Sequence, residues 1–153
     1  MPDTVRRQEE RLCQQLAVVS DGIDFLSCKA TLYRSLNYHR SASGTRHPKS
    51  IWRVSRPCEC HTFCQAELGN WVDLDGNCWY TSRDAEVELG TRGERVAFFD
   101  APVNETDPWH GYPIGGRQGL PSSHRPPDVV IQNWYDSNWI SYTIFLRLMS
   151  GRL

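Results

Sequence analysis

The stretch over residues 71–80 constrains the fold most strongly, because it predicts a tight β-hairpin. Asp75-Gly76 stands between two runs, residues 71–74 and 77–80, that are rich in aromatic and other apolar side chains. Both turn residues tolerate a positive φ, as the favoured two-residue hairpin turns require. We therefore expect residues 71–74 to pair antiparallel with residues 77–80.

Local signals on either side of this hairpin predict the rest of a sheet region between residues 30 and 102. Alternating apolar residues bounded by turn residues indicate strands, and a run of small polar residues indicates a loop. The expected elements are strands over residues 30–36, 51–55 and 95–99, with Pro57 ending the second of these, a loop over residues 37–50, and a short helix over residues 83–89 that Thr81 or Ser82 caps and Gly90 ends.

Helices are expected at both ends of the chain. Within residues 1–22, apolar side chains recur at about helical spacing between a possible cap at Thr4 and a stop at Asp21-Gly22, which predicts a helix over residues 4–20. Near the other end, the sequence predicts an α-hairpin over residues 127–150.

The C-terminal α-hairpin is expected to follow a long loop. Residues 103–126 hold most of the proline and glycine and predict little regular structure. Pro127 then begins the first helix where proline is well tolerated, and Ser141 caps the second. The apolar side chains expected in the core are Trp134, Ile144, Phe145 and Leu148.

Composition bounds the class of protein. A chain of 153 residues suits one domain, and this order of elements predicts an α+β fold. A net charge of −1, with Arg147 as the one basic residue of the last expected helix, does not indicate nucleic-acid binding. No run approaches the roughly 18 apolar residues of a membrane span. Because the N-terminus lacks the apolar segment of a secretory signal, a cytoplasmic protein is expected.

Four cysteines form a candidate zinc site. Cys58, Cys60 and Cys64 lie close together with His61, and Cys78 follows later in the chain. Thiolates and imidazole are the ligands of structural zinc, although paired C-x2-C spacing is missing here. A reactive pair formed by Cys58 and Cys60, or cysteines that only pack, are the alternatives. Without an export signal, a disulfide framework is the less favoured explanation of the cysteines.

The order of several residues resembles that of a known superfamily. Tyr33-Arg34 lies in an expected early strand, and Tyr80-Thr81-Ser82 ends the hairpin before Glu86 and Glu88. This order is similar to that of the ADP-ribosyltransferase superfamily. The stretch 69–88 resembles in particular its RES-domain branch, NAD-consuming toxins that carry a G-R-W…G…Y-x-S…E run.

The resemblance implies an NAD-consuming enzyme, a toxin or effector that transfers ADP-ribose or hydrolyses NAD. It implies that Arg34 holds the pyrophosphate, that Tyr80 stacks on nicotinamide and that Ser82 orients the pocket. Glu88, with Glu86 in reserve, would then steady the positive charge that develops on the ribose.

A second function class remains open from the sequence. Asn70 stands where the RES-domain run has arginine, and the aromatic and acidic residues of the resemblance are also typical of a core and a solvated surface. The alternative is a non-catalytic interaction module of the inhibitor or immunity type, zinc-stabilised or not. Such a module is expected to expose an apolar patch around Trp109, His110 and Tyr112. A protein partner or target is expected.

Overall fold

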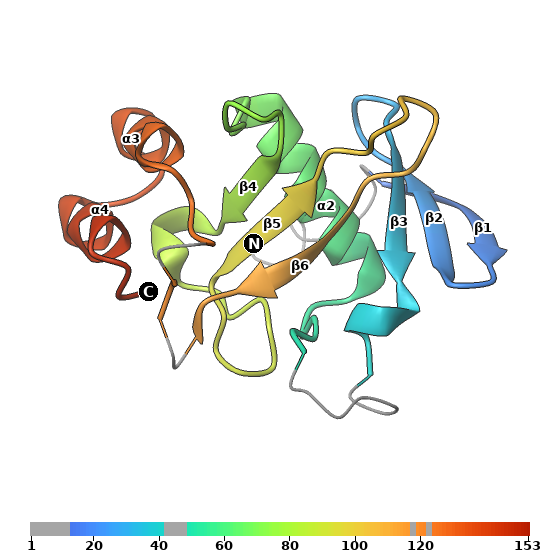
Figure 1. Ribbon diagram of the computed structural model, residues 1–153, viewed down its shortest axis with the longest axis horizontal. Helices are drawn as coiled ribbons and strands as arrows, with labels where there is room; N and C mark the ends of the chain where they lie inside the picture. Colours follow the sequence, from blue (N-terminus) through green and yellow to red (C-terminus); the bar gives the residue numbers. More distant parts are fainter. Residues whose placement is uncertain (1–12, 42–48, 117–118, 122–123) are drawn as a thin grey trace, which may run out of the picture.

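Two three-stranded antiparallel sheets and three α-helices make up the part of the chain that the computed structural model describes, residues 13–41, 49–116, 119–121 and 124–153 (Figure 1). The α+β class expected from the sequence is confirmed. None of the helices in these ranges is long and apolar enough to cross a bilayer. In chain order, the elements are β1 (Gln14–Val19), β2 (Gly22–Leu26), β3 (Leu32–Leu36), the 3-10 turn η1 (Asn37–His39), α2 (Arg56–Gly69), β4 (Cys78–Thr81), the 3-10 turn η2 (Arg83–Ala85), β5 (Val96–Asp100), β6 (His110–Ile114), α3 (Asp128–Asp136) and α4 (Tyr142–Met149).

The two sheets meet where β3 runs beside the start of β6. Tyr33 and Trp109 form a parallel bridge, and the backbone N–H of Arg34 donates to the carbonyl of Trp109 at 2.7 Å. Helix α2 lies between the two sheets in the view of Figure 1 and contacts strands of both. Its Phe63 stacks on Tyr33 with ring centroids 5.1 Å apart and meets Phe99 of β5 at 5.4 Å. One aromatic core therefore joins both sheets.

The helix expected over residues 4–20 is wrong for the residues that the structure describes. Residues 14–19 form β1, which pairs with β2 through a turn at Ser20-Asp21; residues 1–12 lie outside the described residues. The apolar spacing does not mark a buried helical face, since Leu16 and Val18 are exposed at 49% and 75%. Residues 14–19 form a strand because they pair with β2. Packing against a neighbouring strand can outweigh a helix-like spacing of apolar residues.

Only a single bridge occurs where the second strand was expected over residues 51–55. Trp52 bridges Gly90, and the chain then enters α2, a helix that the sequence analysis missed. Ser55 caps α2 by accepting a hydrogen bond from the N–H of Cys58 at 3.3 Å. Pro57 sits in the first turn, where its missing N–H costs no helical hydrogen bond. Proline that was expected to end a strand therefore begins a helix.

The expected hairpin at residues 71–80 is confirmed as an antiparallel contact but not as a full two-stranded ladder. Val72 bridges Cys78, and the N–H of Trp79 donates to the carbonyl of Trp71 at 2.9 Å. Gly76 has a φ of 85°, as the turn requires. The regular ladder of β4 lies on its other side, with β5, so residues 71–74 form no strand of the sheet.

The short helix expected over residues 83–89 is reduced to the single turn η2. Asp84 and Ala85 have φ values of 56° and 52°, which an α-helix does not allow. The N–H of Asp84 donates to the carbonyl of Trp139 at 2.9 Å, and its carboxylate accepts from the N–H of Ser141 at 2.9 Å. These contacts with the α3–α4 turn hold the backbone out of the helical conformation.

Strand β5 confirms the strand expected over residues 95–99, whereas the loop expected over residues 103–126 contains β6. Gly111 and Pro113 hid this strand in the sequence. Gly111 packs so tightly that a β-carbon there would lie 2.3 Å from the ring of Phe99. Glycine, which usually indicates a loop, is therefore required at position 111 because β6 passes close to the ring of Phe99.

The C-terminal α-hairpin is confirmed. Helices α3 and α4 lie side by side at the end of the molecule opposite β1 (Figure 1). Trp134 and Leu148 are fully buried, whereas Ile144 and Phe145 are partly buried. The hydroxyl of Ser141 accepts from the N–H of Ile144 at 3.3 Å and caps α4. The hairpin therefore packs on the main core as its sequence predicted.

Candidate functional site

An open hollow of about 500 Å³ gathers both glutamates that the sequence singled out. We call it the glutamate hollow; its polar lining is Arg53, Ser55, Cys58, Glu86, Glu88 and Arg95. Three segments build it: the approach to α2, the first turn of α2, and the loop between η2 and β5. Two arginines and two glutamates thus face one space beside the start of a helix.

Glu88 lies between the two arginines of this hollow. Its carboxylate accepts a hydrogen bond from Arg53 at 2.6 Å and lies 3.7 Å from the guanidinium of Arg95. Arg95 also donates to the carbonyls of Ala85 and Glu86 at 2.9 and 3.0 Å. Arg95 therefore positions the backbone that carries both glutamates.

Ser82 forms a hydrogen bond with the backbone of the same loop. Its side chain is buried, and its hydroxyl accepts a hydrogen bond from the N–H of Val87 at 2.9 Å. Because Val87 stands between the two glutamates, this bond fixes the segment that presents them. Ser82 is a positioning residue for the hollow and does not line it.

Tyr80 lies in the core and is 7% exposed. It pairs with Ala97 across β4 and β5, and its ring lies 6.1 Å from that of Trp71. Tyr80 is not among the residues that line the glutamate hollow. The Tyr80-x-Ser82 strand therefore does not line the hollow; Tyr80 packs in the core, and Ser82 holds the loop that carries the glutamates.

Arg34 lies in a different hollow. Its guanidinium donates to both carboxylate oxygens of Asp24, at 2.7 and 3.2 Å, and to Asp21 at 3.3 Å. The hydrogen bond with Asp24 raises the pKa of Arg34 above its ordinary value. The hollow that Arg34 lines, of about 520 Å³, also contains Asp100, Asp107 and His110. The structure thus brings Glu86, Glu88 and the Ser82 support together, and leaves Arg34 apart from them.

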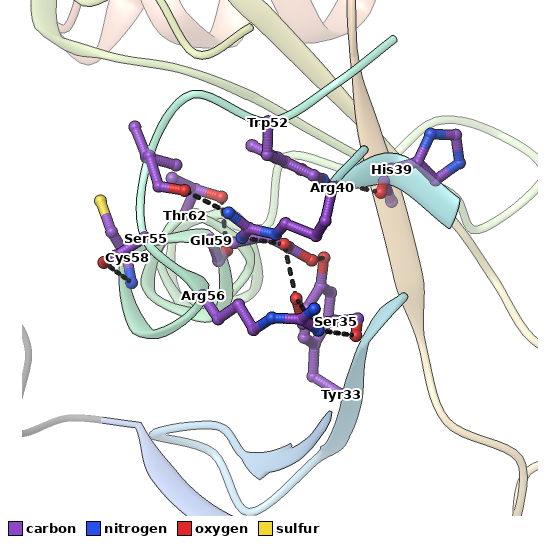
Figure 2. A network of polar contacts seen from close by, with 12 residues as sticks. Tyr33, Ser35, His39, Arg40, Trp52, Ser55, Arg56, Cys58, Glu59 and Thr62 are labelled. Atoms are coloured by element: carbon purple, nitrogen blue, oxygen red, sulfur yellow. Dashed lines mark hydrogen bonds and ion pairs between the residues drawn. The ribbon is translucent and has the colours of Figure 1, made fainter. Parts of the chain in front are cut away.

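A buried polar network anchors one wall of the glutamate hollow (Figure 2). Glu59, in the first turn of α2, is 1% exposed and accepts hydrogen bonds from the hydroxyls of Tyr33 at 2.5 Å and Ser35 at 2.8 Å. Arg40 forms an ion pair with the same carboxylate and also donates to the carbonyl of Val54 at 2.5 Å. Since Val54 lines the hollow, Arg40 ties that lining to the buried carboxylate.

Burial governs the electrostatics of this network. Desolvation raises the pKa of Glu59, and the charge of Arg40 and the hydroxyl donors oppose that shift. Desolvation, followed by the charge of Glu59, raises the pKa of Tyr33 well above its ordinary value. Sequence reasoning missed Glu59 because it stands among cysteines that suggested a metal. The helix-start signal Ser55-Arg56-Pro57 could have revealed its place in a first turn.

The four cysteines of the expected zinc site are not brought together. Cys64 forms a disulfide with Cys28, with 5.8 Å between their α-carbons, so its sulfur is no thiolate ligand. Cys78 lies in β4 and is buried, where desolvation raises the pKa of its thiol to about 12. Within the described ranges, no three His, Cys, Asp or Glu side chains are arranged to hold a metal ion. The structure thus gives no support to zinc, and it contains one disulfide, although the sequence made a disulfide framework the less favoured arrangement.

The patch expected around Trp109, His110 and Tyr112 is only partly exposed. Trp109 packs on Phe63 with ring centroids 5.2 Å apart. Tyr112 lies between two imidazole rings, with centroids 5.1 Å from His39 and 5.7 Å from His124. Trp109 and Tyr112 therefore pack on aromatic rings outside this group, and more exposed apolar side chains, such as Tyr142, lie elsewhere on the molecule.

Comparisons with known proteins add no family to this description. No family model matches the chain, and neither the curated proteins nor the solved structures gave a match. The resemblance to ADP-ribosyltransferases therefore depends on the order of the residues named above.

Proposed function

We propose that this protein binds NAD in the glutamate hollow and breaks the bond between nicotinamide and ribose, with transfer of ADP-ribose to a target or to water. The observation that carries the proposal is the position of Glu88 between Arg53 and Arg95 in a hollow large enough for part of a dinucleotide. The Tyr80-x-Ser82 strand followed by Glu86 and Glu88 is the sequence feature that indicates this chemistry.

The charges of the hollow suit the two ends of such a reaction. Cleavage of the glycosidic bond builds positive charge on the ribose, and a carboxylate beside it stabilises the transition state more than the ground state. An arginine side chain presents a planar fork that matches phosphate oxygens. In this proposal Arg53 or Arg95 exchanges its contact with Glu88 for the pyrophosphate, and Glu88 then faces the ribose.

The roles of the remaining residues follow from their positions. Arg34 is neutralised by Asp24 and Asp21 in the other hollow, so we assign the pyrophosphate to Arg53 and Arg95 instead. Ser82 holds the glutamate loop, and Tyr80 supports its strand from the core. Glu86 remains the reserve carboxylate, since its side chain lines the same hollow.

Nicotinamide release tests the assignment directly. The purified protein would be incubated with NAD, with and without cell extract, while free nicotinamide and labelled ADP-ribose are followed. We expect release that falls at least about tenfold in Glu88→Gln or Arg53→Ala and persists in Glu105→Gln, a matched change of an exposed glutamate. The Arg34→Ala variant decides between the two hollows.

Retained release in Arg34→Ala supports the glutamate hollow, provided that the variant melts as a folded protein. Release lost in Arg34→Ala but kept in Glu88→Gln would move the site to the Arg34 hollow. No release above background by the wild-type protein, with NAD or with extract, would contradict NAD consumption altogether.

A second candidate function is a non-catalytic interaction module, and a specific surface favours it. On the α3–α4 hairpin, Tyr142 and Leu146 are exposed at 58% and 44%. The ring of Phe145 lies 4.9 Å from that of Tyr135 and 6.1 Å from that of Tyr142. Apolar side chains grouped in this way are typical of protein-binding surfaces.

The interaction surface has its own test. A tagged protein would be cross-linked in cells and purified, next to a Leu146→Asp variant and the matched surface variant Glu105→Gln. A stoichiometric partner that Glu105→Gln retains and Leu146→Asp loses supports the module. A partner that binds all three proteins equally, or none that binds the wild type, would exclude this surface.

The compartment belongs to the proposal as well. We propose a cytoplasmic location, which would give access to NAD, whereas a disulfide such as Cys28–Cys64 is typical of an oxidising compartment. Trapping of thiols in intact cells before lysis distinguishes the two. A cytoplasmic protein is expected to carry Cys28 and Cys64 as alkylated thiols.

A further inference from the structure

Two cysteines lie at the open end of the β1–β2 hairpin. Gln14 pairs with Leu26 at that end of the ladder. Cys13 immediately precedes Gln14, and Cys28 follows Leu26 by two residues. The hairpin register therefore brings both cysteines to the same end of the first sheet.

Helix α2 presents two cysteines to this end. Cys60 and Cys64 are four residues apart, so they lie one above the other on one helical face. Both are fully buried. Cys64 is already bonded to Cys28, which fixes this face of α2 against the hairpin.

The remaining two cysteines of this group, Cys13 and Cys60, are both free and both buried. The side chain of Cys13, followed by burial, raises the pKa of the Cys60 thiol above its ordinary value. Cys13 is 7% exposed, whereas residues 14–18 of β1 are exposed. Cys13, which directly precedes β1, therefore packs in the core at this end of the strand.

We propose that Cys13 and Cys60 form a second disulfide, parallel to Cys28–Cys64 and one helical turn away from it along α2. The two bridges would fasten both strands of the hairpin to one face of the helix. This inference is independent of the proposed function, since neither thiol lines the glutamate hollow.

The bond forms by ordinary thiol–disulfide exchange with a low-molecular-weight disulfide. One thiol loses its proton, and its sulfur attacks a sulfur of the oxidant, which releases one thiolate. The second cysteine sulfur, also deprotonated, attacks the mixed disulfide and releases the second thiolate. Two protein thiols are thus oxidised to one disulfide while the oxidant is reduced to two thiols.

Burial dictates when this exchange takes place. The thiolate is the attacking species, and the folded protein disfavours it at Cys60 and excludes a bulky oxidant. We therefore expect the bond to form during folding, or when the hairpin opens from α2, and to form slowly in the native protein.

Refolding in a glutathione redox buffer tests the inference. The full chain would be reduced, unfolded, refolded with oxidised and reduced glutathione, then unfolded again and alkylated. Of the six cysteines in the chain, only Cys58 and Cys78 are expected to react with the alkylating agent. Cleavage after Glu59 and after Phe63 separates Cys58, Cys60 and Cys64, so that mass spectrometry can identify each linked pair.

The expected linked peptides are Cys13–Cys60 and Cys28–Cys64. Four alkylated cysteines with Cys28–Cys64 as the single bridge, or a bridge between Cys13 and any partner other than Cys60, would overturn the proposal. Two variants guard against an effect of misfolding. Cys78→Ala is expected to keep both bridges, and a Cys28→Ala/Cys64→Ala chain that retains its native melting signal is expected to keep Cys13–Cys60.

Discussion

The hydroxyl of Tyr33 donates a hydrogen bond of 2.5 Å to the carboxylate of Glu59, and this contact joins β3 to the first turn of α2. Ser35 and Arg40 bind the same carboxylate. The start of α2 is therefore held by groups that precede it by about twenty residues in the chain, and the hollow beside it depends on their arrangement.

Replacing Glu59 by glutamine is expected to destabilise the protein by about 3–5 kcal/mol, because it leaves the charge of Arg40 without its carboxylate in a mostly buried position. Chemical denaturation measures the loss. Glu105→Gln, on the surface, should change stability by less than about 0.5 kcal/mol. A double variant, Arg40→Met/Glu59→Leu, should recover much of the loss, and a strictly additive double variant would show that the two side chains do not act as a pair.

Stability is expected to fall as the pH drops below about 6.5, in part through His124. Burial among Trp79, Phe98 and Tyr112 lowers its pKa below the ordinary value of 6.5, although Asp100 opposes the shift. In that window the unfolded chain binds the proton and the folded chain does not, so protonation favours unfolding.

The measurement for His124 is the melting temperature between pH 7.5 and 5.5. His124→Phe keeps a ring in the stack but cannot titrate, so it should lose less stability than the wild type over this interval. Equal losses in both proteins would assign the pH dependence to other groups, such as His39, whose pKa burial also lowers.

Removing the C-terminal hairpin is expected to expose core surface. Trp134 is fully buried, and Trp71 lies 6.0 Å from it and 5.2 Å from Trp139. Truncation before Pro127 should destabilise the protein by several kcal/mol, since each large buried side chain contributes about 1.5–3 kcal/mol.

Point variants separate packing from truncation. Trp134→Ala alone should cost about 3–5 kcal/mol, whereas Tyr142→Ala, at an exposed position, should cost little. Calorimetry of the three proteins checks the order. A truncated chain that melts like the full one would show that the hairpin is an appendage.

Loss of the Cys28–Cys64 disulfide is expected to reduce stability by about 4 kcal/mol, from the entropy of a loop with a sequence separation of 36 residues. The comparison is the wild type against Cys28→Ser/Cys64→Ser in denaturant, under oxidising conditions. Cys58→Ser is the matched control and should leave the midpoint nearly unchanged. The same midpoint for the double variant and the wild type would contradict a stabilising bridge.

Elements whose signals are local could be predicted from the sequence alone. The α3–α4 hairpin has an apolar side and a Ser141 cap within its own residues. Strand β3 alternates between buried and half-buried residues, and β5 is a short apolar run, so both could be predicted without knowledge of their neighbours. The Asp75-Gly76 turn likewise depends on backbone preferences of two adjacent residues, and the structure keeps it.

Only part of the candidate site could be predicted from the sequence. Glu86 and Glu88 are close in the chain, so their shared hollow follows from one loop. Arg53 reaches Glu88 from 35 residues away, and Arg34 is taken by Asp24 instead. Sheet register and the position of α2 determine which arginine pairs with which carboxylate. The spacing of residues in the sequence does not predict these pairs.

Tertiary structure decided the rest because partners far apart in the chain outweighed local preference. The buried face of helix α2 includes the polar side chains of Glu59, His61 and Thr62, so the sequence of α2 shows no apolar helical face. Glu59 can be buried there because Tyr33 and Ser35, which are far away in the sequence, donate hydrogen bonds to it. Residues 14–19 became a strand because β2 offers them a ladder. A local pattern sets what a segment can form by itself, whereas burial and pairing energy, which require the folded neighbours, set what it does form.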